Sequence, residues 1–414
     1  MKRLSSTELK HAKKRKLSWL TNGIIFFSFI GILFYGLAVF AFGTEEETSD
    51  IEGRALEQRP EFSVSTFLDG TYMETFASSA NDQVFQRDLW IEGQSWFQRN
   101  VLRQEMNNGV INVDGMLLSP ETNASEYSSF GEFLKEFQIE MKTNEIPVYF
   151  ASAPSKPVYA TRNEIFPAYV ETVDLENREQ LHKRVNEAGI PLIDLEQKLE
   201  GMDGEEVYFK TDHHWRAEGA FAGYQEIMSV LSKDYPESRL LAKEDVKTNE
   251  VDGPFYGSSA REISIAYVEE ADTFTYLEPT DGFSTTVCRD FDDCGHEVLD
   301  REVLENTTDF TNYYNLFLGD NYAQLKIEQE NPLNDLHVLV LKDSYANPLL
   351  GYLGESFGTV SAIDVRYAKG KVDITDYIED EEIDFVYLCI MIESQVWPVI
   401  IRMHFKKLGN EGIR

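Results

Sequence analysis

The 414-residue sequence predicts an α/β fold, in which helices cover both faces of a mostly parallel β-sheet. Two observations support this class, and a third adds a membrane anchor to it. Strand-like and helix-like segments alternate from about residue 130 to 232. The alternation returns from 336 to 391 after an irregular insertion. One long apolar stretch at the N-terminus precedes these segments and predicts a single transmembrane helix.

The N-terminal stretch is long enough to cross a bilayer. Residues 17–44 carry no charge and exceed the roughly 20 residues that a spanning helix needs. Basic residues precede the stretch and three glutamates follow it, so the N-terminus should be cytoplasmic and the rest of the chain extracellular. We expect a basic tail at 1–17 and an anchor at 18–43. A cleaved signal peptide has a shorter apolar core, although Ala-Phe-Gly near the end leaves cleavage open.

The remainder is strongly acidic. The chain carries a net charge of −34, and because its tail is basic, the part beyond the anchor is more acidic still. Such a surface repels nucleic acid and anionic lipid headgroups. A hydrophobic content of 42% suffices for a folded core, in one large domain or two smaller ones.

The elements after the anchor can be taken in order. Residues 44–60 are acidic and polar and are interpreted as a stalk, and residues 61–414 as the ectodomain. The ectodomain begins with a partly helical segment to about residue 110. Residues 111–118 alternate around Asp114-Gly115, which predicts a hairpin.

The alternating part follows the hairpin. Apolar residues recur at helical spacing at Phe130, Phe133, Leu134, Phe137 and Met141. The further predicted segments are a strand at 146–153, a helix at 175–188 that ends at Gly189, a strand at 190–195 and a helix at 216–232.

Residues 238–330 interrupt the rhythm and are interpreted as an insertion or a small β-rich cap. The last predicted strands are 337–341, 361–367 and 383–391, with a helix after the first and a helical link between the other two. Cys288 and Cys294 could form a small disulfide or remain two thiols, and Cys389 should be buried. No CxxC pair exists, so the sequence contains neither a zinc ribbon nor a redox motif.

The segment KTDHHW carries the strongest chemical signal. If its backbone is extended, Asp212 and His214 share a side and His213 faces away. A carboxylate beside an imidazole can fix its tautomer and stabilise its protonated form. His214 is therefore a candidate base and Asp212 its orienting partner, while Trp215 would pack at the start of the next helix. The plainer alternative is a set of surface or capping residues before a helix.

A base needs a nucleophile, and three serines have suggestive surroundings. Ser344 lies where a buried strand turns into a helix, at the sheet edge where α/β proteins bind ligands. The helix N-terminus beside it could hold an oxyanion. Ser258 lies in irregular sequence, and Ser155 follows a strand between Pro154 and Lys156. Ser344 is preferred, although it or Asp343 could simply cap the helix.

TDHHW followed downstream by KDSYAN resembles the DHHW family of bacterial envelope proteins. These are similar to the SGNH-hydrolase-like proteins that acetylate alginate and related polysaccharides. The resemblance spans nearly all of the ectodomain. It includes the segments DGTYMETFASSANDQVFQRDLW (69–90), NVDGMLL (112–118), YFASAPSK (149–156), FYGS (255–258) and LFLGDN (316–321).

The resemblance implies a three-layer α/β/α sandwich and a catalytic set of Ser344, His214 and Asp212. It also implies a glycine and an asparagine at the oxyanion, for which LFLGDN offers Gly319 and Asn321. Trp215 and Tyr345 are further candidates for substrate binding. No metal or cofactor is implied. Arg366 could contact an anionic group, but an ion pair with Asp364 is favoured.

The sequence therefore predicts a membrane-anchored, extracytoplasmic acyltransferase or esterase acting on an envelope polysaccharide. The resemblance implies a multi-pass membrane O-acyltransferase that hands the acetyl group across the membrane. The alternative is a non-catalytic glycan-binding or scaffold protein on the same fold. DHH phosphoesterases are disfavoured because the chain lacks their aspartate motifs, and palmitoyl transferases because tryptophan stands where they need cysteine.

Overall fold

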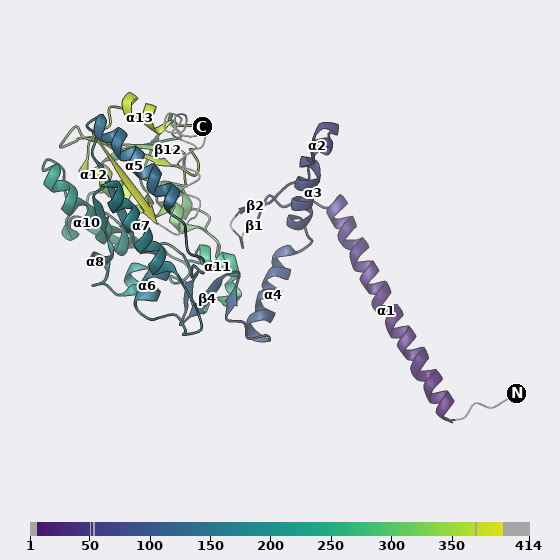
Figure 1. Ribbon diagram of the computed structural model, residues 1–414. Helices are drawn as coiled ribbons and strands as arrows, with labels where there is room; N and C mark the ends of the chain where they lie inside the picture. Colours follow the sequence, from purple (N-terminus) through teal and green to yellow (C-terminus); the bar gives the residue numbers. More distant parts are fainter. Residues whose placement is uncertain (1–5, 50, 53, 369–370, 392–414) are drawn as a thin grey trace. The chain divides into compact units, whose positions relative to one another are not determined.

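The computed structural model describes residues 6–49, 51–52, 54–368 and 371–391. It divides into two compact units, one up to Gln94 and one from Ser95 (Figure 1). Residues 1–5 of the predicted basic tail lie outside the described part.

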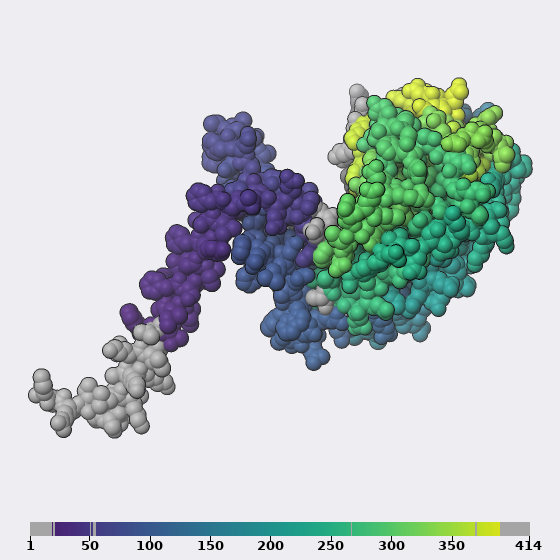
Figure 2. All heavy atoms as spheres, turned by 180° about the vertical axis from the view of Figure 1, so that it is seen from behind, coloured from purple at the N-terminus to yellow at the C-terminus, as the bar shows by residue number. Residues whose placement is uncertain are grey.

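The first unit is helical. Helix α1 (Ser6–Phe42) contains the apolar span Thr21–Phe42, of mean hydropathy 2.5. None of this span is buried, and Figure 2 shows helix α1 uncovered along much of its length by its own unit. Length and composition thus allow a membrane span, as the sequence predicts. The other elements of this unit are β1 (Thr48–Ser49), β2 (Arg54–Ala55), α2 (Val64–Asp69), α3 (Thr71–Asp82) and the start of α4 (Arg87–Asn100).

The predicted stalk contains ordered structure. Strands β1 and β2 pair within it as a short antiparallel hairpin. The Gln83 amide bonds the backbone of Glu46, and the Asp82 carboxylate accepts the backbone N–H of Glu57. Glu46 and Glu57 are thereby attached to the end of helix α3.

The second unit opens with the predicted hairpin. Strands β4 (Val110–Val113) and β5 (Met116–Leu118) pair around Asp114 and Gly115, both with positive φ, and β3 (Met106–Asn107) adds a third strand.

An eight-stranded sheet forms the centre of this unit, in the order β11-β10-β12-β14-β13-β15-β6-β7. The strands from β14 to β7 run parallel, and those at the other end pair antiparallel, so the sheet is mixed. Their bounds are β6 (Val148–Ala153), β7 (Leu192–Asp194), β10 (Thr285–Arg289), β11 (Asp293–His296), β12 (Gln324–Gln329), β13 (His337–Lys342), β14 (Thr359–Asp364) and β15 (Phe385–Met391).

Helices cover both faces of the sheet, as the alternation predicts (Figure 1). Strand β13 shows the division, because Val338 and Val340 pack in one apolar cluster, and Leu339 and Leu341 pack in the other. The first cluster includes helices α10 (Ala217–Asp234) and α12 (Asn347–Ser356). The second includes α5 (Ser128–Thr143), α7 (Asp174–Ala188) and α13 (Ile374–Asp380). The result is the expected α/β/α sandwich. Short helices α6 (Lys156–Arg162), α8 (Glu196–Leu199) and α9 (Gly204–Val207) link these layers.

The region 238–330 is β-rich, but it is more than a cap. It contains the pair β8 (Val246–Glu250) and β9 (Thr275–Pro279) and helix α11 (Ser258–Ile263). Its strands β10, β11 and β12 join the central sheet through β14. Cys288 and Cys294 are disulfide-bonded across β10 and β11, and Cys389 is buried.

Candidate active site

The serine lies where strand β13 ends. Asp343 caps the following turn, because its carboxylate accepts the backbone N–H of Tyr345 at 3.0 Å. The cap role is thus filled by Asp343, and the Ser344 hydroxyl is left to face a different partner. The turn runs directly into helix α12, so the sheet edge and a helical N-terminus meet at this residue.

The histidine lies in a loop held by buried polar groups. An antiparallel bridge between Tyr208 and Trp215 closes the loop just before helix α10. The buried Lys156 ammonium donates to three loop carbonyls, including that of Asp212 at 2.6 Å. The Asp272 carboxylate accepts the backbone N–H groups of Lys210 and Thr211. The loop is therefore anchored from both sides.

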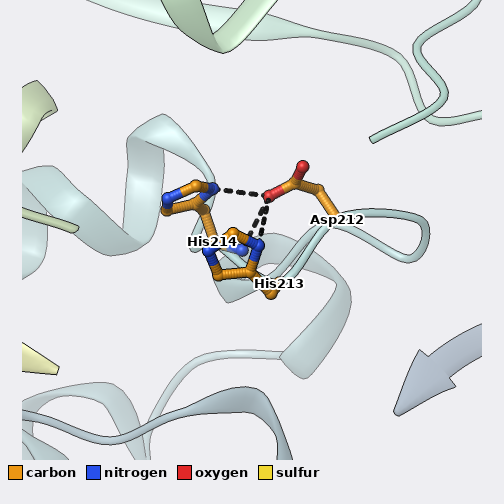
Figure 3. Close-up of side chains that lie close together, drawn as sticks. All are labelled: Asp212, His213 and His214. Carbon is orange, nitrogen blue, oxygen red and sulfur yellow. Dashed lines mark hydrogen bonds and ion pairs between the residues drawn. The ribbon is translucent and has the colours of Figure 1, made fainter. Parts of the chain in front are cut away.

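The three residues predicted to act together lie in one row. The Nδ1 atom of His214 is 2.6 Å from Oδ1 of Asp212, and its Nε2 atom is 2.9 Å from Oγ of Ser344. All three side chains are buried. Figure 3 shows the Asp212 carboxylate beside both histidine rings. Residues 130 positions apart in the chain thus meet within hydrogen-bonding distance.

The charge on Asp212 fixes the direction of these bonds. Burial alone would raise the pKa of this carboxyl, but the two histidines and the Ser258 backbone N–H outweigh it, and the pKa lies well below its usual range. An ionised carboxylate can only accept hydrogen bonds, so Nδ1 of His214 must carry the proton. In the neutral ring Nε2 is then an acceptor, and the Ser344 hydroxyl donates to it.

His213 does not face away, which corrects the prediction from an extended backbone. The loop bends here, and the backbone N–H of His214 donates to the Asp212 side chain at 2.8 Å. The bend brings the two histidine rings to a centroid distance of 3.8 Å. Nδ1 of His213 lies 2.5 Å from Oγ of Ser258 and 3.7 Å from Oδ1 of Asp212. Two fifths of this side chain remain exposed, at 41%.

Asp212, His213 and His214 also form a set of donors that could hold a metal ion. One ligand atom from each lies within 4.8 Å of the others. A cation bound at Nδ1 of His214 would displace the proton that this atom shares with Asp212. Metal binding in this place and the hydrogen-bonded row are therefore mutually exclusive.

Two contacting residues were not found by sequence reasoning. The Tyr314 ring stacks on His214 at a centroid distance of 3.8 Å, and its hydroxyl donates to the Ser344 carbonyl at 3.2 Å. Gly257 lies against Asp212 so closely that a Cβ atom there would come within 2.5 Å of its Oδ2. Gly257 belongs to the FYGS segment, which the resemblance marked. Tyr314 lies two residues before LFLGDN, which the resemblance also marked, but no pattern in the sequence singled out Tyr314 itself.

Two of the substrate-binding candidates are structural. Trp215 is 0% exposed, and its indole N–H donates to the Tyr345 carbonyl at 3.0 Å. Tyr345 is 1% exposed, and its hydroxyl donates to the His213 carbonyl. Neither side chain is exposed at a surface where a substrate could bind in this structure. Both instead connect the histidine loop with the serine turn.

The two oxyanion candidates differ from each other. The Gly319 backbone N–H donates to the Asn315 carbonyl at 2.9 Å, and Arg289 and Asp300 crowd its α-carbon, so this N–H is already used. Asn321 accepts a 3.3 Å bond from Asn347, which lies in the first turn after Ser344. Asn321 therefore stays a candidate, and Gly319 is the weaker one.

The remaining predicted alternatives have other roles. The Ser155 hydroxyl accepts the backbone N–H of Val158 and caps helix α6. Arg366 binds the Asp364 carboxylate through two nitrogens, at 2.9 and 2.6 Å, which is the structural ion pair expected.

Known proteins share this architecture. Residues 114–276 match the family model for the SGNH hydrolase-like domain of acetyltransferase AlgX. Two structures of Bacillus cereus PatB1, one with a sulfonyl adduct, match at 25% and 26% identity with TM-scores of 0.59 and 0.56. They cover 70% and 69% of this chain and 96% of PatB1.

A DHHW family protein from Eubacterium siraeum shares the fold, with a TM-score of 0.56 at 22% identity over 72% of this chain and 97% of its own. No curated protein sequence matches the chain. The chain therefore has the SGNH-hydrolase-like α/β fold of PatB1 and of the DHHW family protein, and its residues 114–276 are similar to the domain of acetyltransferase AlgX.

Proposed function

We propose that this protein is a membrane-anchored, extracytoplasmic Ser-His-Asp acyltransferase or esterase that acts on O-acetyl groups of a cell-envelope polysaccharide. The observation that carries the proposal is the hydrogen-bonded row from Asp212 through His214 to Ser344. The match to an acetyltransferase domain supports an acetyl group as the group that is transferred.

In the first step Ser344 Oγ attacks the carbonyl carbon of an acetyl donor, and its proton passes to Nε2 of His214. The Asp212 carboxylate stabilises the imidazolium that forms. The backbone N–H of Ser344 and the Asn321 amide are the proposed oxyanion donors. Collapse of the tetrahedral intermediate expels the donor's leaving group, which takes the proton from His214.

In the second step a sugar hydroxyl or water loses its proton to Nε2 and attacks the acetyl ester on Ser344. The products are an acetylated sugar or acetate, together with the free serine. The acetyl donor would reach this side of the membrane through a multi-pass membrane O-acyltransferase. The non-catalytic alternative, a glycan-binding scaffold, predicts an unreactive serine.

Replacing Ser344 by Ala tests the proposal. We expect turnover of a chromogenic acetyl ester to fall by about 10³-fold or more, because the nucleophile is lost. A sulfonyl fluoride is a suitable covalent probe, because such an adduct is found in PatB1. Mass spectrometry should place the adduct on Ser344 in the wild type.

Ser258→Ala is the matched control, because the Ser258 hydroxyl is hydrogen-bonded to His213 and not to His214. The control should still be labelled at Ser344. Undiminished ester turnover by Ser344→Ala would reject this nucleophile. A wild-type protein that binds polysaccharide but takes up no probe would favour the scaffold.

A further inference from the structure

The segment of residues 62–90, which follows helix α1 and contains helices α2, α3 and the start of α4, exposes large apolar side chains. Six of them, called the collar here, are Phe62, Phe67, Leu68, Met73, Leu89 and Trp90. Their exposed fractions reach 79% at Leu68 and 69% at Trp90. The surface of a protein in water seldom exposes so many large apolar groups within about 30 residues of chain, which favours a covering partner for this unit.

Ring contacts connect the collar to the apolar span. Phe40 in helix α1 contacts Phe76 at a centroid distance of 5.5 Å. Phe76 stacks on Tyr72, at 6.1 Å, and Tyr72 contacts Phe62 of the collar, at 5.4 Å. A continuous row of aromatic rings thus leads from the span to the collar.

A second ring contact shows how far the segment before helix α4 extends along the apolar span. Tyr35 of helix α1 contacts Phe85, which lies two residues before the start of helix α4, at a centroid distance of 5.6 Å. Tyr35 lies seven residues before Phe42, which corresponds to roughly 10 Å along a helix at 1.5 Å per residue. The segment before helix α4 therefore lies beside the last turns of the span, and not beyond its end.

The end of helix α1 is also built into the unit by polar bonds. The Arg59 guanidinium donates to the carbonyls of Phe40, Ala41 and Gly43 at 2.8 to 3.0 Å. It also pairs with Glu45 at 2.9 Å. The last carbonyls of a helix have no partners within it and favour a positive charge. Removal of helix α1 would leave Arg59 and the ring row without these partners.

Arg87, at the start of helix α4, supplies a counter-charge to three neighbouring acids. Arg87 lies 2.8 Å from Glu52, 3.7 Å from Asp88 and 3.9 Å from Asp82, so these acids share a counter-charge. The Trp90 indole N–H is bonded to the Phe85 carbonyl at 3.2 Å. A tryptophan with a satisfied N–H and an exposed ring suits the boundary between headgroups and acyl chains.

From these contacts we infer that helix α1 is retained as an anchor and that the collar is immersed in the outer leaflet of the bilayer at its headgroup boundary. The occupant of the apolar surface is lipid. The row of rings from Phe40 to Phe62 joins the collar to the apolar span, which favours lipid over a soluble partner. Without lipid around the collar, one end of this row would lie among acyl chains and the other end in water. The inference does not depend on the proposed chemistry.

Nitroxide labels on the full-length protein test this inference. Leu68→Cys and Trp90→Cys report on the collar, and Ser78→Cys, an exposed polar site on helix α3, is the control. The native cysteines interfere little, because Cys288 and Cys294 are disulfide-bonded and Cys389 is buried. The proteins are placed in nanodiscs, and each label is exposed to molecular oxygen, which concentrates in hydrocarbon, and to a water-soluble nickel chelate.

We expect the ratio of oxygen to nickel accessibility to exceed one at both collar sites and to fall below one at Ser78→Cys. Collar labels that behave like the control would overturn the inference. So would collar labels shielded from both reagents, which would indicate a protein contact instead of lipid. Phe67→Cys serves as a third collar site if either variant folds poorly. Intact mass measurement of membrane-extracted protein should show helix α1 present, and a product that begins after Gly43 would equally reject the inference.

Discussion

At the scale of single residues, the Asp212 carboxylate organises the candidate site. It accepts three hydrogen bonds, from the backbone and Nδ1 of His214 at 2.8 and 2.6 Å and from the Ser258 backbone at 2.6 Å. The short aspartate side chain can reach the N–H two residues on only because the loop bends. The same bonds that shape the loop therefore set the orientation of the imidazole ring.

Gly257 makes this arrangement possible, which leads to a prediction. A methyl group in Gly257→Ala would overlap Asp212 and displace its carboxylate. Because a misplacement of about 1 Å can cost 10²-fold in rate, we expect kcat for an acetyl ester to fall by about that factor. KM should change little, because the methyl group acts on the orienting carboxylate. Steady-state kinetics with the purified variant provides the measurement.

Gly201→Ala is the matched control, because no atom lies within 4 Å of the Cβ that it would gain. The control should keep wild-type kcat. Thermal unfolding of Gly257→Ala separates a local effect from loss of the fold. A folded variant with unchanged kcat would show that the position of Asp212 does not govern the reaction.

At the scale of elements, the site depends on two segments that hold each other. The Trp215 indole bonds the backbone after Ser344, and the Tyr345 hydroxyl bonds the backbone of His213. Each bond spans 130 or more positions of sequence. The strand-turn-helix at Ser344 positions the hydroxyl, and these crossed bonds bring the histidine loop to it.

Local patterns in the sequence were enough to predict most elements of the sandwich. The apolar run of β13 and the helical spacing of α5 each match the structure within a few residues. What could not be predicted depends on long-range packing. The bend at His213, the burial of Trp215 and Tyr345, and the extension of the sheet by β10 and β12 are set by partners distant in sequence. Sequence spacing carries no information about those partners.

A pair of carboxyl groups beside helix α7 gives a prediction on pH and stability. Burial, and then the neighbouring Asp174, raises the pKa of Glu121, and burial also raises the pKa of Asp174. A carboxyl whose pKa is raised by folding binds its proton more tightly in the folded state, so its contribution to stability grows as pH falls through that pKa. At neutral pH both carboxyl groups are ionised, and their ionisation lowers the free energy of unfolding.

Glu121→Gln should therefore raise the urea midpoint at pH 7 to 8. The gain in unfolding free energy should stay well below the ~1.4 kcal/mol of one full pKa unit, because Glu121 is only partly buried and solvent screens it. The advantage should vanish as pH falls below the usual value of 4.5, where the wild-type carboxyl is protonated too. Glu136→Gln, at an exposed position of helix α5, should show no such pH dependence. A variant difference that is constant with pH would contradict this explanation.

At the scale of the whole molecule, charge and hydropathy are divided sharply along the chain. Basic residues precede the apolar span, and the chain beyond it is more negative than the net charge of −34 for the whole protein. A carboxylate-rich surface favours neutral or cationic partners over nucleic acid and anionic lipid. The neutral polysaccharide proposed as substrate is compatible with this charge, and the proposed outward orientation would bring the second unit to it.

This orientation gives the last prediction. Because positive charge stays on the cytoplasmic side, a cysteine at Thr7→Cys should be protected from a membrane-impermeant maleimide in intact spheroplasts and react only after permeabilisation. A cysteine at Asp281→Cys, an exposed position of the second unit, should react in both cases. The wild type should remain largely unlabelled, because its cysteines are paired or buried. Labelling of Thr7→Cys but not Asp281→Cys in intact spheroplasts would place the candidate active site in the cytoplasm, where neither an envelope polysaccharide nor a partner that exports acetyl groups would be needed.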